Sequence, residues 1–341
     1  MKALFYEELK GYTGIKLGEL PVPDISETEV LVRVKAFSLN HLDVWVMSGT
    51  YPLKPPLPHI FASDCAGVVE KAGKAVSHVK PGDKVIVHPG LSCGRCDHCL
   101  AGKDNECKEF TLLGVVTPGV SAEYVKVPAA NIFRKPSGLS FEEAAGIGIT
   151  YVTAWTSLVL RAGIRQGDTV LIHGGGGGAG TALIQTAKLF NTRVITTVGD
   201  DGKIEKAKAI GADNVINHTK EDFLEAVKRI TSGSRVDIVV DHVGATTFNR
   251  SLAAVRKGGQ VVTFGSTTGD EVSLSLRYLF GRSLTIYGVY TGPRSALGEC
   301  LKLFPHKLRT VVDSVFEFKD AQKAYEKLLS RQFFGKIVVR V

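Results

Sequence analysis

The first part of the chain alternates apolar and polar positions. Residues 30–35 read Val-Leu-Val-Arg-Val-Lys, the pattern of a half-buried strand. Pro81-Gly82-Asp83 marks a turn before a second short apolar run at residues 84–87. The pattern predicts a β-rich domain with long loops over residues 1–127.

After Phe141 the pattern changes to short apolar strands that alternate with segments of helical periodicity. Such β-α repeats predict a parallel sheet covered on both faces over residues 128–290. The last segment, 291–341, ends in an apolar strand and is expected to complete the first domain. The expected strands are 169–173, 193–198, 215–216, 236–240, 260–264, 284–287 and 336–340, and the expected helices are 181–190, 203–210 and 222–230.

A run of glycines joins the first of these strands to the first helix. It contains the spacing G-x-G-x-x-G at Gly175, Gly177 and Gly180, with Gly178 and Ala179 between them. Glycine there allows a tight turn, close approach of a pyrophosphate and close helix packing, while the helix N-terminus attracts the phosphates. A flexible glycine linker is the alternative, but the strand before and the helix after favour a dinucleotide site.

The choice between NAD(H) and NADP(H) is made near the end of the second strand, where an acid would bind the ribose diol. Gly199, Asp200 and Lys203 follow that strand. Lys203 would neutralise a 2′-phosphate, whereas Asp200 would repel one. The sequence leaves the choice open, with NADP(H) slightly favoured.

Four cysteines lie close together at Cys93, Cys96, Cys99 and Cys107. Four thiolates suit a closed tetrahedral zinc site, which leaves no position for a substrate. The prediction is therefore one structural zinc. Two disulfides or free thiols are the alternative, expected in a secreted chain or in some hyperthermophiles.

Composition places the chain among ordinary globular proteins, with 44% hydrophobic and 22% charged residues. The net charge of +8 comes from basic residues interleaved with acidic ones, so no nucleic-acid partner is expected. No signal peptide is expected, because Glu7 and Glu8 stand where its apolar stretch would be, and no run approaches about 18 apolar residues. A soluble cytoplasmic protein without membrane contact is expected.

Several further short motifs carry a family resemblance. Together with the glycine loop and the four cysteines, the chain resembles the medium-chain dehydrogenase/reductase superfamily, in particular its quinone oxidoreductase-like branch. The resemblance implies an α/β protein with a GroES-like catalytic domain, a doubly wound Rossmann domain, and assembly into homodimers or homotetramers. The motifs are Asn40–Asp43, Ala66–Glu70, Pro81–Val85, Ala122–Val125, Thr153–Trp155, Gly211–Asp213 and Phe334–Val338.

Zinc alcohol dehydrogenases of this superfamily bind a catalytic zinc, and their ligand positions can be matched onto this chain. The first falls on Asn40, a His-Glu pair falls on Ser63 and Asp64, and the third ligand falls near Ile149. The proton-relay hydroxyl falls on Leu42. Only Asp64 is a good ligand, and one carboxylate is too few for zinc, so no catalytic zinc is expected.

Without a metal, conjugate hydride addition to an enone or quinone is easier than direct carbonyl reduction, because the charge spreads into an enolate or hydroquinone. Asn40 and Tyr51 are the candidate hydrogen-bond donors, and Asp64 completes the catalytic candidates. The alternatives are that Asn40 caps a turn and that Tyr51 packs in a loop. The resemblance also implies cofactor contacts from His41, Thr153, Gly244, Gly265 and Lys336.

The leading interpretation is an NAD(P)H-dependent reductase of quinones or α,β-unsaturated carbonyls. An alcohol dehydrogenase or aldehyde reductase is one alternative, and it requires metal in the pocket. A nicotinamide-nucleotide-binding redox sensor without turnover is the other. His59, His88 and His173 are interpreted as structural residues rather than catalytic bases.

Overall fold

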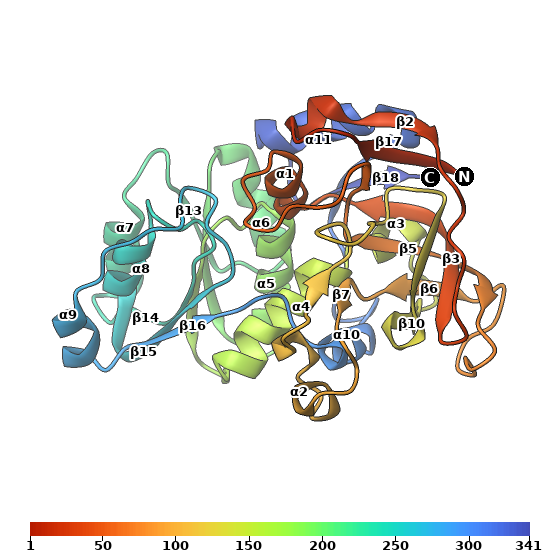
Figure 1. The fold of residues 1–341 in the computed structure, drawn as a ribbon. Coiled ribbons are helices and arrows are strands. Elements are labelled where there is room, and N and C mark those ends of the chain that lie inside the picture. The colour runs from red at the N-terminus through yellow and green to blue at the C-terminus, as the bar shows by residue number, and fades with distance from the viewer. The chain divides into compact units, whose positions relative to one another are not determined.

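The computed structural model describes residues 1–341 and divides into two compact units (Figure 1). The first unit comprises residues 1–152 and 293–341, and the second comprises residues 153–292. The division therefore comes later than residue 127, because strand β10 (Ile132–Arg134) still pairs with β6 (Lys84–Val87) of the first unit. No helix has the length and apolar character needed to cross a membrane.

The first unit is built on a seven-stranded sheet. Its strand order is β10-β6-β5-β3-β18-β17, and β9 also pairs with β3. The predicted alternation around residue 30 forms β3, where Val30, Val32 and Val34 enter the core. Strand β3 spans Glu29–Ser38. The remaining strands of this sheet are β5 (Asp64–Ala72), β9 (Tyr124–Pro128), β17 (Val312–Glu317) and β18 (Lys336–Arg340).

The C-terminal strand completes this sheet, as predicted. β18 pairs antiparallel with β3, with Val338 opposite Ser38, and brings residue 336 beside residue 39. Smaller sheets and helices surround the core. They are β1 (Lys2–Tyr6), β2 (Lys16–Glu19), β4 (His59–Ile60), β7 (Gly90–Leu91), β8 (Thr111–Leu112), α1 (His41–Met47), α2 (Asp97–Leu100), α3 (Phe141–Ala145), α10 (Arg294–Leu301) and α11 (Ala321–Ser330).

The second unit contains a six-stranded parallel sheet in the order β13-β12-β11-β14-β15-β16. This is the doubly wound arrangement expected for a dinucleotide-binding domain. Helix α4 (Gly148–Trp155) leads into the unit. The strands are β11 (Thr169–Ile172), β12 (Arg193–Val198), β13 (Asn214–Asn217), β14 (Val236–Val240), β15 (Val255–Thr263) and β16 (Thr285–Gly288).

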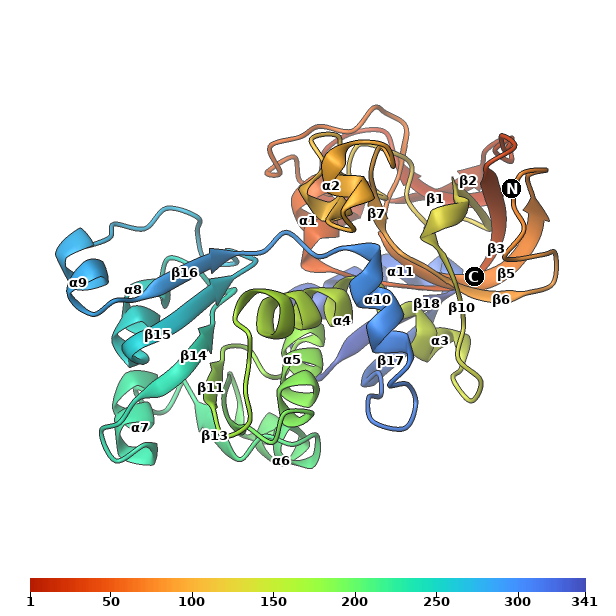
Figure 2. The ribbon, with the colours of Figure 1, turned by 90° about the horizontal axis from the view of Figure 1, so that it is seen from below.

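Helices cover both faces of this sheet (Figure 2). On one face, α7 (Phe223–Ile230) and α8 (Phe248–Ala254) pack their apolar residues against Leu171 of β11 and Val239 of β14. On the other face lies α5 (Gly178–Lys188), in contact with β11 and β12. Helices α6 (Ile204–Ala209) and α9 (Leu276–Gly281) complete the unit.

Two elements begin three residues or more away from their predicted starts. Helix α5 begins at Gly178 rather than at residue 181, so part of the glycine run is helical. Strand β15 begins at Val255 rather than at residue 260. The polar and glycine-rich start of β15 hid it from the hydrophobic pattern, because Gly258 adopts a φ of 73° and Gly259 passes close to the backbone of β14.

Candidate functional site

The glycine loop joins β11 to α5, and two of its glycines are required by the protein itself. A Cβ on Gly175 would lie 2.2 Å from Thr196 Oγ1, and one on Gly180 would lie 2.1 Å from the Gly174 carbonyl oxygen. Gly177 is different, because a Cβ there would meet nothing closer than 3.5 Å. The missing side chain at Gly177 therefore leaves open space at the start of an 11-residue helix, where a phosphate group is well placed.

The residues expected to choose between the two nicotinamide cofactors form one ion pair. Lys203 Nζ lies 3.1 Å from Asp200 Oδ2, directly after β12 and Gly199. The Lys203 side chain is only 15% exposed, whereas that of Asp200 is 54% exposed. A 2′-phosphate and Asp200 would therefore compete for the same ammonium group.

Gly244 and Gly265 follow the fourth and fifth strands of the sheet. Gly244 has a φ of 94°, and a Cβ there would lie 2.4 Å from the Gly269 carbonyl oxygen. Gly265 lies beside the backbone of His242. Thr153 is buried on α4. The structure thus places Gly175, Gly244 and Gly265 after three strands of one sheet, all at the carboxyl edge where α/β proteins bind ligands.

Three of the predicted site residues meet in a buried cluster in the first unit. Asn40 Nδ2 donates to Asp64 Oδ2 at 2.9 Å, and Lys336 Nζ donates to Asn40 Oδ1 at 2.8 Å. Lys336 Nζ also donates to the Leu39 carbonyl at 2.7 Å and lies 3.5 Å from Asp64 Oδ2. The Asn40 amide is therefore fixed in orientation, with one Nδ2–H left for another acceptor.

The Asp64 carboxylate is held from a second side by backbone. Its Oδ1 accepts a 2.7 Å hydrogen bond from Ile149 N, and a Cβ on Gly148 would lie 2.4 Å from the same oxygen. Burial raises the pKa of Asp64, while the Lys336 ammonium group and these hydrogen bonds oppose the rise. Burial also lowers the pKa of Lys336, against the attraction of Asp64. Each charge is thus stabilised mainly by the other.

A second buried carboxylate, Asp43, lies beside this cluster and was not singled out from the sequence. It accepts hydrogen bonds from Asn40 N at 2.9 Å and from Tyr325 Oη at 3.0 Å, and it forms the capping box of α1. Burial raises its pKa to about 7. The Asn-x-x-Asp spacing of a capping box could have pointed to Asp43. Its contact with Tyr325 had no such signal, because that tyrosine lies on a helix near the C-terminus.

Tyr51 and His41 lie near α1 but have different surroundings. Tyr51 is half-buried and packs against the apolar cluster of Val46, Leu112 and Val115. The His41 ring meets the Trp45 ring edge to face, with centroids 5.1 Å apart. The structure therefore brings together Asn40, Asp64 and Lys336, whereas Tyr51 packs in a separate apolar cluster and His41 packs against Trp45.

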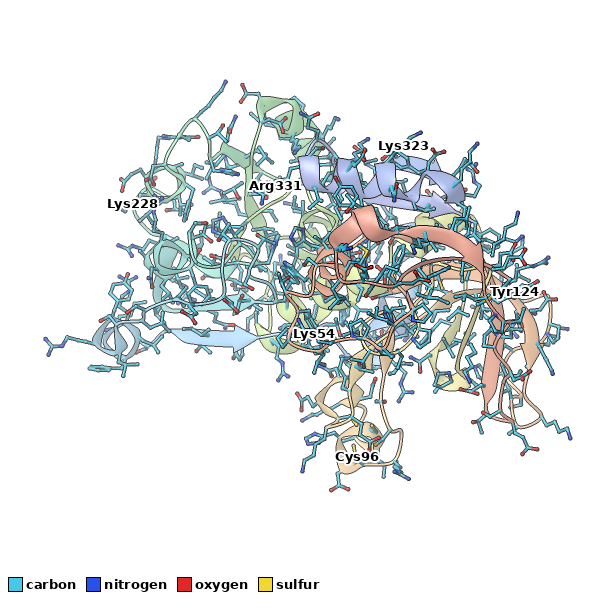
Figure 3. The ribbon with its side chains drawn as sticks, turned by 45° about the horizontal axis from the view of Figure 1, so that its top comes forward. Lys54, Cys96, Tyr124, Lys228, Lys323 and Arg331 are labelled. Carbon is cyan, nitrogen blue, oxygen red and sulfur yellow. The ribbon has the colours of Figure 1, made fainter.

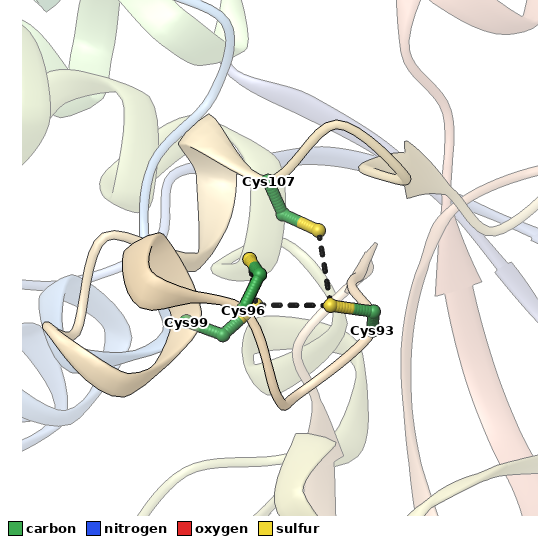
Figure 4. A group of neighbouring side chains, drawn as sticks. All are labelled: Cys93, Cys96, Cys99 and Cys107. Carbon is green, nitrogen blue, oxygen red and sulfur yellow. Dashed lines mark hydrogen bonds between the residues drawn. The ribbon is translucent and has the colours of Figure 1, made fainter.

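The four cysteines converge in a lobe that projects from the rest of the first unit around Cys96 (Figure 3). Their Sγ atoms all lie within 4.8 Å of one another, with Cys93 3.9 Å from Cys99 and 3.5 Å from Cys107 (Figure 4). Zinc with Zn–S bonds of about 2.3 Å places tetrahedral sulfur atoms about 3.8 Å apart. The four thiols therefore fit a zinc ion, and no other group of three or more such ligands occurs in the chain.

The lobe is also tied to helix α10. Asp104, which lies between the third and fourth cysteines, accepts a hydrogen bond from Arg294 N at 3.2 Å. Its carboxylate also lies 3.3 Å from Arg294 Nε, and its side chain is only 4% exposed. This ion pair connects the lobe to the first residues after the chain leaves the second unit.

Comparison with known proteins agrees with this architecture. An alcohol dehydrogenase GroES-like domain model matches residues 26–137, and a zinc-binding dehydrogenase model matches residues 178–305. An alcohol dehydrogenase of Geobacillus stearothermophilus is 33% identical over 100% of both chains. The chain belongs to the medium-chain dehydrogenase/reductase superfamily.

Two further members of this superfamily that resemble the chain differ in the reaction that their names give. The crystal structure of an NAD-dependent alcohol dehydrogenase superposes with a TM-score of 0.96 at 43% identity, covering 100% of both chains. A quinone oxidoreductase of Sus scrofa is 27% identical, over 94% of this chain and 91% of its own. The chain is therefore an NAD(P)-dependent oxidoreductase of this superfamily, with alcohol dehydrogenases more similar to it than the quinone oxidoreductase.

The catalytic zinc of the superfamily's alcohol dehydrogenases does not fit the matching positions of this member. Asn40 is already bonded to Asp64 and Lys336, and Ser63 Oγ donates to the Leu113 carbonyl at 2.7 Å. Ile149 offers only its backbone there. A single carboxylate paired with an ammonium group does not make a zinc site.

Proposed function

We propose that this member of the superfamily reduces a conjugated acceptor, a quinone or an α,β-unsaturated carbonyl compound, without a catalytic zinc. The observation that carries the proposal is the Asn40–Asp64–Lys336 cluster. Asn40 and Asp64, which match metal-ligand positions of the alcohol dehydrogenases, are hydrogen-bonded to each other instead, and Lys336 places one ammonium group beside them. Hydride addition to a conjugated acceptor requires less electrophilic activation than direct carbonyl reduction, because charge is delocalised in the product.

A bound NAD(P)H supplies the hydride in this proposal. The remaining Nδ2–H of Asn40 donates to the acceptor oxygen, so that negative charge developing on that oxygen meets a fixed donor. Lys336 and Asp64 hold the amide in place and are positioning residues. Tyr51 or water then gives the proton that completes the reduction. One zinc bound by Cys93, Cys96, Cys99 and Cys107 stiffens the lobe and takes no part in hydride transfer.

The test is loss of nicotinamide absorbance with NADPH and NADH in parallel, against quinones, enones and aldehydes. Oxidation with quinones or enones but not with aldehydes supports the proposal. Asn40→Ala should then lower kcat by about 10²-fold, the usual cost of removing one oxyanion donor. Ser38→Ala removes a buried hydrogen bond from the end of β3, to the Ala145 carbonyl, and should leave kcat unchanged. Unchanged turnover in both Asn40→Ala and Tyr51→Phe would contradict the assignment.

The names of the relatives favour a second candidate, an alcohol dehydrogenase or aldehyde reductase. It predicts turnover confined to alcohols and aldehydes, and two zinc ions per chain instead of one. Tight nucleotide binding without turnover of any acceptor would instead indicate a redox sensor. Metal analysis and the acceptor panel together separate these three functions.

Cofactor preference rests on the Asp200–Lys203 ion pair, and we propose a slight preference for NADP(H). Lys203→Met should weaken NADPH binding by about tenfold, the effect of losing one charged hydrogen bond, and leave NADH binding nearly unchanged. Asp200→Asn should strengthen NADPH binding by releasing the ammonium group. If neither variant changed the ratio of NADPH to NADH affinity from that of the wild type, the pair would not read the 2′-position.

We also propose that the chain forms a homodimer or homotetramer through the edge of the parallel sheet. Strand β16 has a neighbour on one side only, and Leu276 and Phe280 of the adjacent helix α9 are 70% and 72% exposed. Phe280→Ser should lower the mass measured by light scattering toward that of the monomer. Leu17→Ser, at another exposed apolar position, is the control and should not.

A further inference from the structure

A chain of side-chain hydrogen bonds lies beneath the glycine loop. It begins at Gly174 N, which donates to Thr197 Oγ1 at 3.1 Å. Thr197 Oγ1 lies 3.2 Å from His173 Nδ1, and His173 Nε2 lies 3.0 Å from Ser251 Oγ. Ser251 Oγ donates to Asp241 Oδ2 at 2.6 Å. The chain thus links the ends of β11, β12 and β14 to helix α8.

The direction of this chain follows from its two ends. Ser251 gives its proton to the Asp241 carboxylate, so Ser251 Oγ accepts from His173 Nε2–H. His173 is then neutral with an unprotonated Nδ1, which accepts from the Thr197 hydroxyl. Every donor therefore points toward Asp241, and the hydroxyl oxygen of Thr197 is left to accept from the glycine loop.

The environment of His173 supports the neutral imidazole. Burial lowers the pKa of His173 to about 4, against the attraction of Asp241 and together with the repulsion of His242, His218 and Arg250. The side chains of Asp241 and Ser251 are fully buried. In such surroundings, hydrogen bonds in series polarise one another, so that a carboxylate at one end strengthens the bond at the other.

Asp241 also organises the loop that follows its own strand. Its Oδ1 accepts from Val243 N at 2.9 Å, Gly244 N at 3.1 Å and Thr247 Oγ1 at 2.9 Å. Gly244 is held there at a φ of 94°, which a residue with a side chain rarely adopts. One buried carboxylate therefore fixes two loops at the carboxyl edge of the sheet, one directly and one through Ser251, His173 and Thr197.

The same three residue types form nucleophilic triads in hydrolases, but their order here is different. In a triad the histidine lies between the serine and the carboxylate and removes the serine proton. Here Ser251 lies in the middle and gives its proton to Asp241, while His173 is on its other side. With its proton engaged and its oxygen buried, Ser251 is not a nucleophile.

We propose that His173, Ser251 and Asp241 are positioning residues that hold the glycine loop and the Gly244 loop in the conformation that binds the nicotinamide dinucleotide. This inference rests on the proposed function, since it assumes that these loops bind the cofactor. Part of the cofactor affinity is thereby assigned to a buried network of the second unit. The network acts on cofactor binding and not on the hydride-transfer step.

The first experiment compares cofactor binding by the full-length protein and its Ser251→Ala variant, measured by NADPH and NADH fluorescence. Ser251→Ala breaks the chain at its centre, and affinity should fall about tenfold, the effect of one buried hydrogen bond. In steady state the KM for the cofactor should rise by the same factor, whereas the KM for the acceptor and kcat should stay within about twofold.

The matched control is Thr231→Val, which removes two hydrogen bonds just before the start of β14, at the end of the strands opposite to the two loops. Thr231 Oγ1 donates to the Val227 carbonyl at 2.8 Å and accepts from Arg235 N at 3.0 Å. This variant should lower the thermal unfolding midpoint without changing cofactor affinity. If Ser251→Ala does the same, the network is merely structural and the proposal is overturned.

A second pair of variants covers the case in which Ser251→Ala does not fold. Thr197→Val keeps the shape but removes the acceptor of Gly174 N, and should reproduce the loss of affinity. Thr197→Ser keeps the hydroxyl and should recover most of it. Equal affinities of these two variants would overturn the inference while leaving the proposed function intact. A wild-type protein that binds neither nucleotide would instead overturn both.

Discussion

The four-cysteine lobe and the cluster of Asn40, Asp64 and Lys336, both in the first unit, differ in what balances their acidic groups. The lobe presents four sulfur atoms within 4.8 Å of one another. The cluster at Asn40, Asp64 and Lys336 contains one ligand-type carboxylate, already neutralised by an ammonium group. The cluster therefore contains its own positive charge, whereas the thiols of the lobe would take theirs from a bound zinc ion.

The cluster shows how a buried carboxylate is stabilised by other residues of the same chain. Asp64 is fully buried, and an isolated charge there would be strongly destabilising. Lys336 from the last strand provides the opposite charge, while Asn40 and Ile149 N satisfy the remaining acceptors. In the lobe the corresponding stabilisation would come from a bound zinc ion.

Removing zinc from the lobe is expected to have the largest effect. Zinc binding contributes about 10–16 kcal/mol in small zinc domains at neutral pH, so residues 92–110 should lose amide-exchange protection in the apoprotein. Cys99→Ser should lower zinc content and thermal stability together, with cofactor affinity barely changed. His98→Ala, at the exposed neighbouring residue of α2, should retain one zinc. A wild-type zinc content of zero or two would remove the contrast between the two sites.

Lys336→Met should have the next largest effect, because it leaves Asp64 buried without its partner. We expect a loss of about 3–5 kcal/mol of unfolding free energy, measured in urea. Arg340→Met is the control on the same strand, since its pairs with Glu142 and Glu317 are exposed and such pairs contribute about 0–1 kcal/mol. Combining Lys336→Met with Asp64→Asn should recover part of the loss. Equal effects of the two single variants would contradict a charge-compensated cluster.

A smaller effect is expected from pH. The pKa of Asp43 rises on folding from its ordinary value of 3.8 to about 7, mainly through burial. The folded state therefore binds this proton more tightly than the unfolded state. The resulting stabilisation is fully present below about pH 4 and is lost as the pH rises through about 7. Asp43→Asn should flatten the fall in melting temperature across this range.

The control for this pH dependence is Asp320→Asn. Asp320 is paired with Lys323, and that hydrogen bond lowers the pKa of its carboxyl group. Its contribution to stability is therefore present above about pH 4 and is lost at lower pH, the opposite sign. Asp320→Asn should leave the profile between pH 4 and 7 unchanged. An unaltered profile in Asp43→Asn would show that other groups cause the fall.

Local patterns in the sequence predicted the elements that depend on neighbouring residues. The fold class, the parallel sheet implied by the β-α repeats and the convergence of the four cysteines were confirmed, because each follows from patterns within short stretches of the chain. The beginning of β15 was missed because Gly258 and Gly259 interrupt its apolar pattern.

The details of the candidate site depend instead on residues far apart in the chain. Asn40 and Lys336 are separated by 296 positions, and His173 and Ser251 by 78. No spacing rule covers such distances. The resemblance named Lys336 as a cofactor contact, and its role stays a prediction; the structure adds that it pairs with Asp64. The linkage of His173 to Ser251 and Asp241 had no sequence signal beyond three isolated polar residues.

The ion pair between Asp104 and Arg294 links the four-cysteine lobe to the segment in which the chain returns to the first unit. The polypeptide passes between its two units twice, after residue 152 and after residue 292, and Arg294 is the second residue beyond the later crossing. At that point the backbone is fastened to Asp104, inside the loop closed by the third and fourth thiols. A zinc ion held by the four thiols would therefore order the segment to which one end of this connection is fastened.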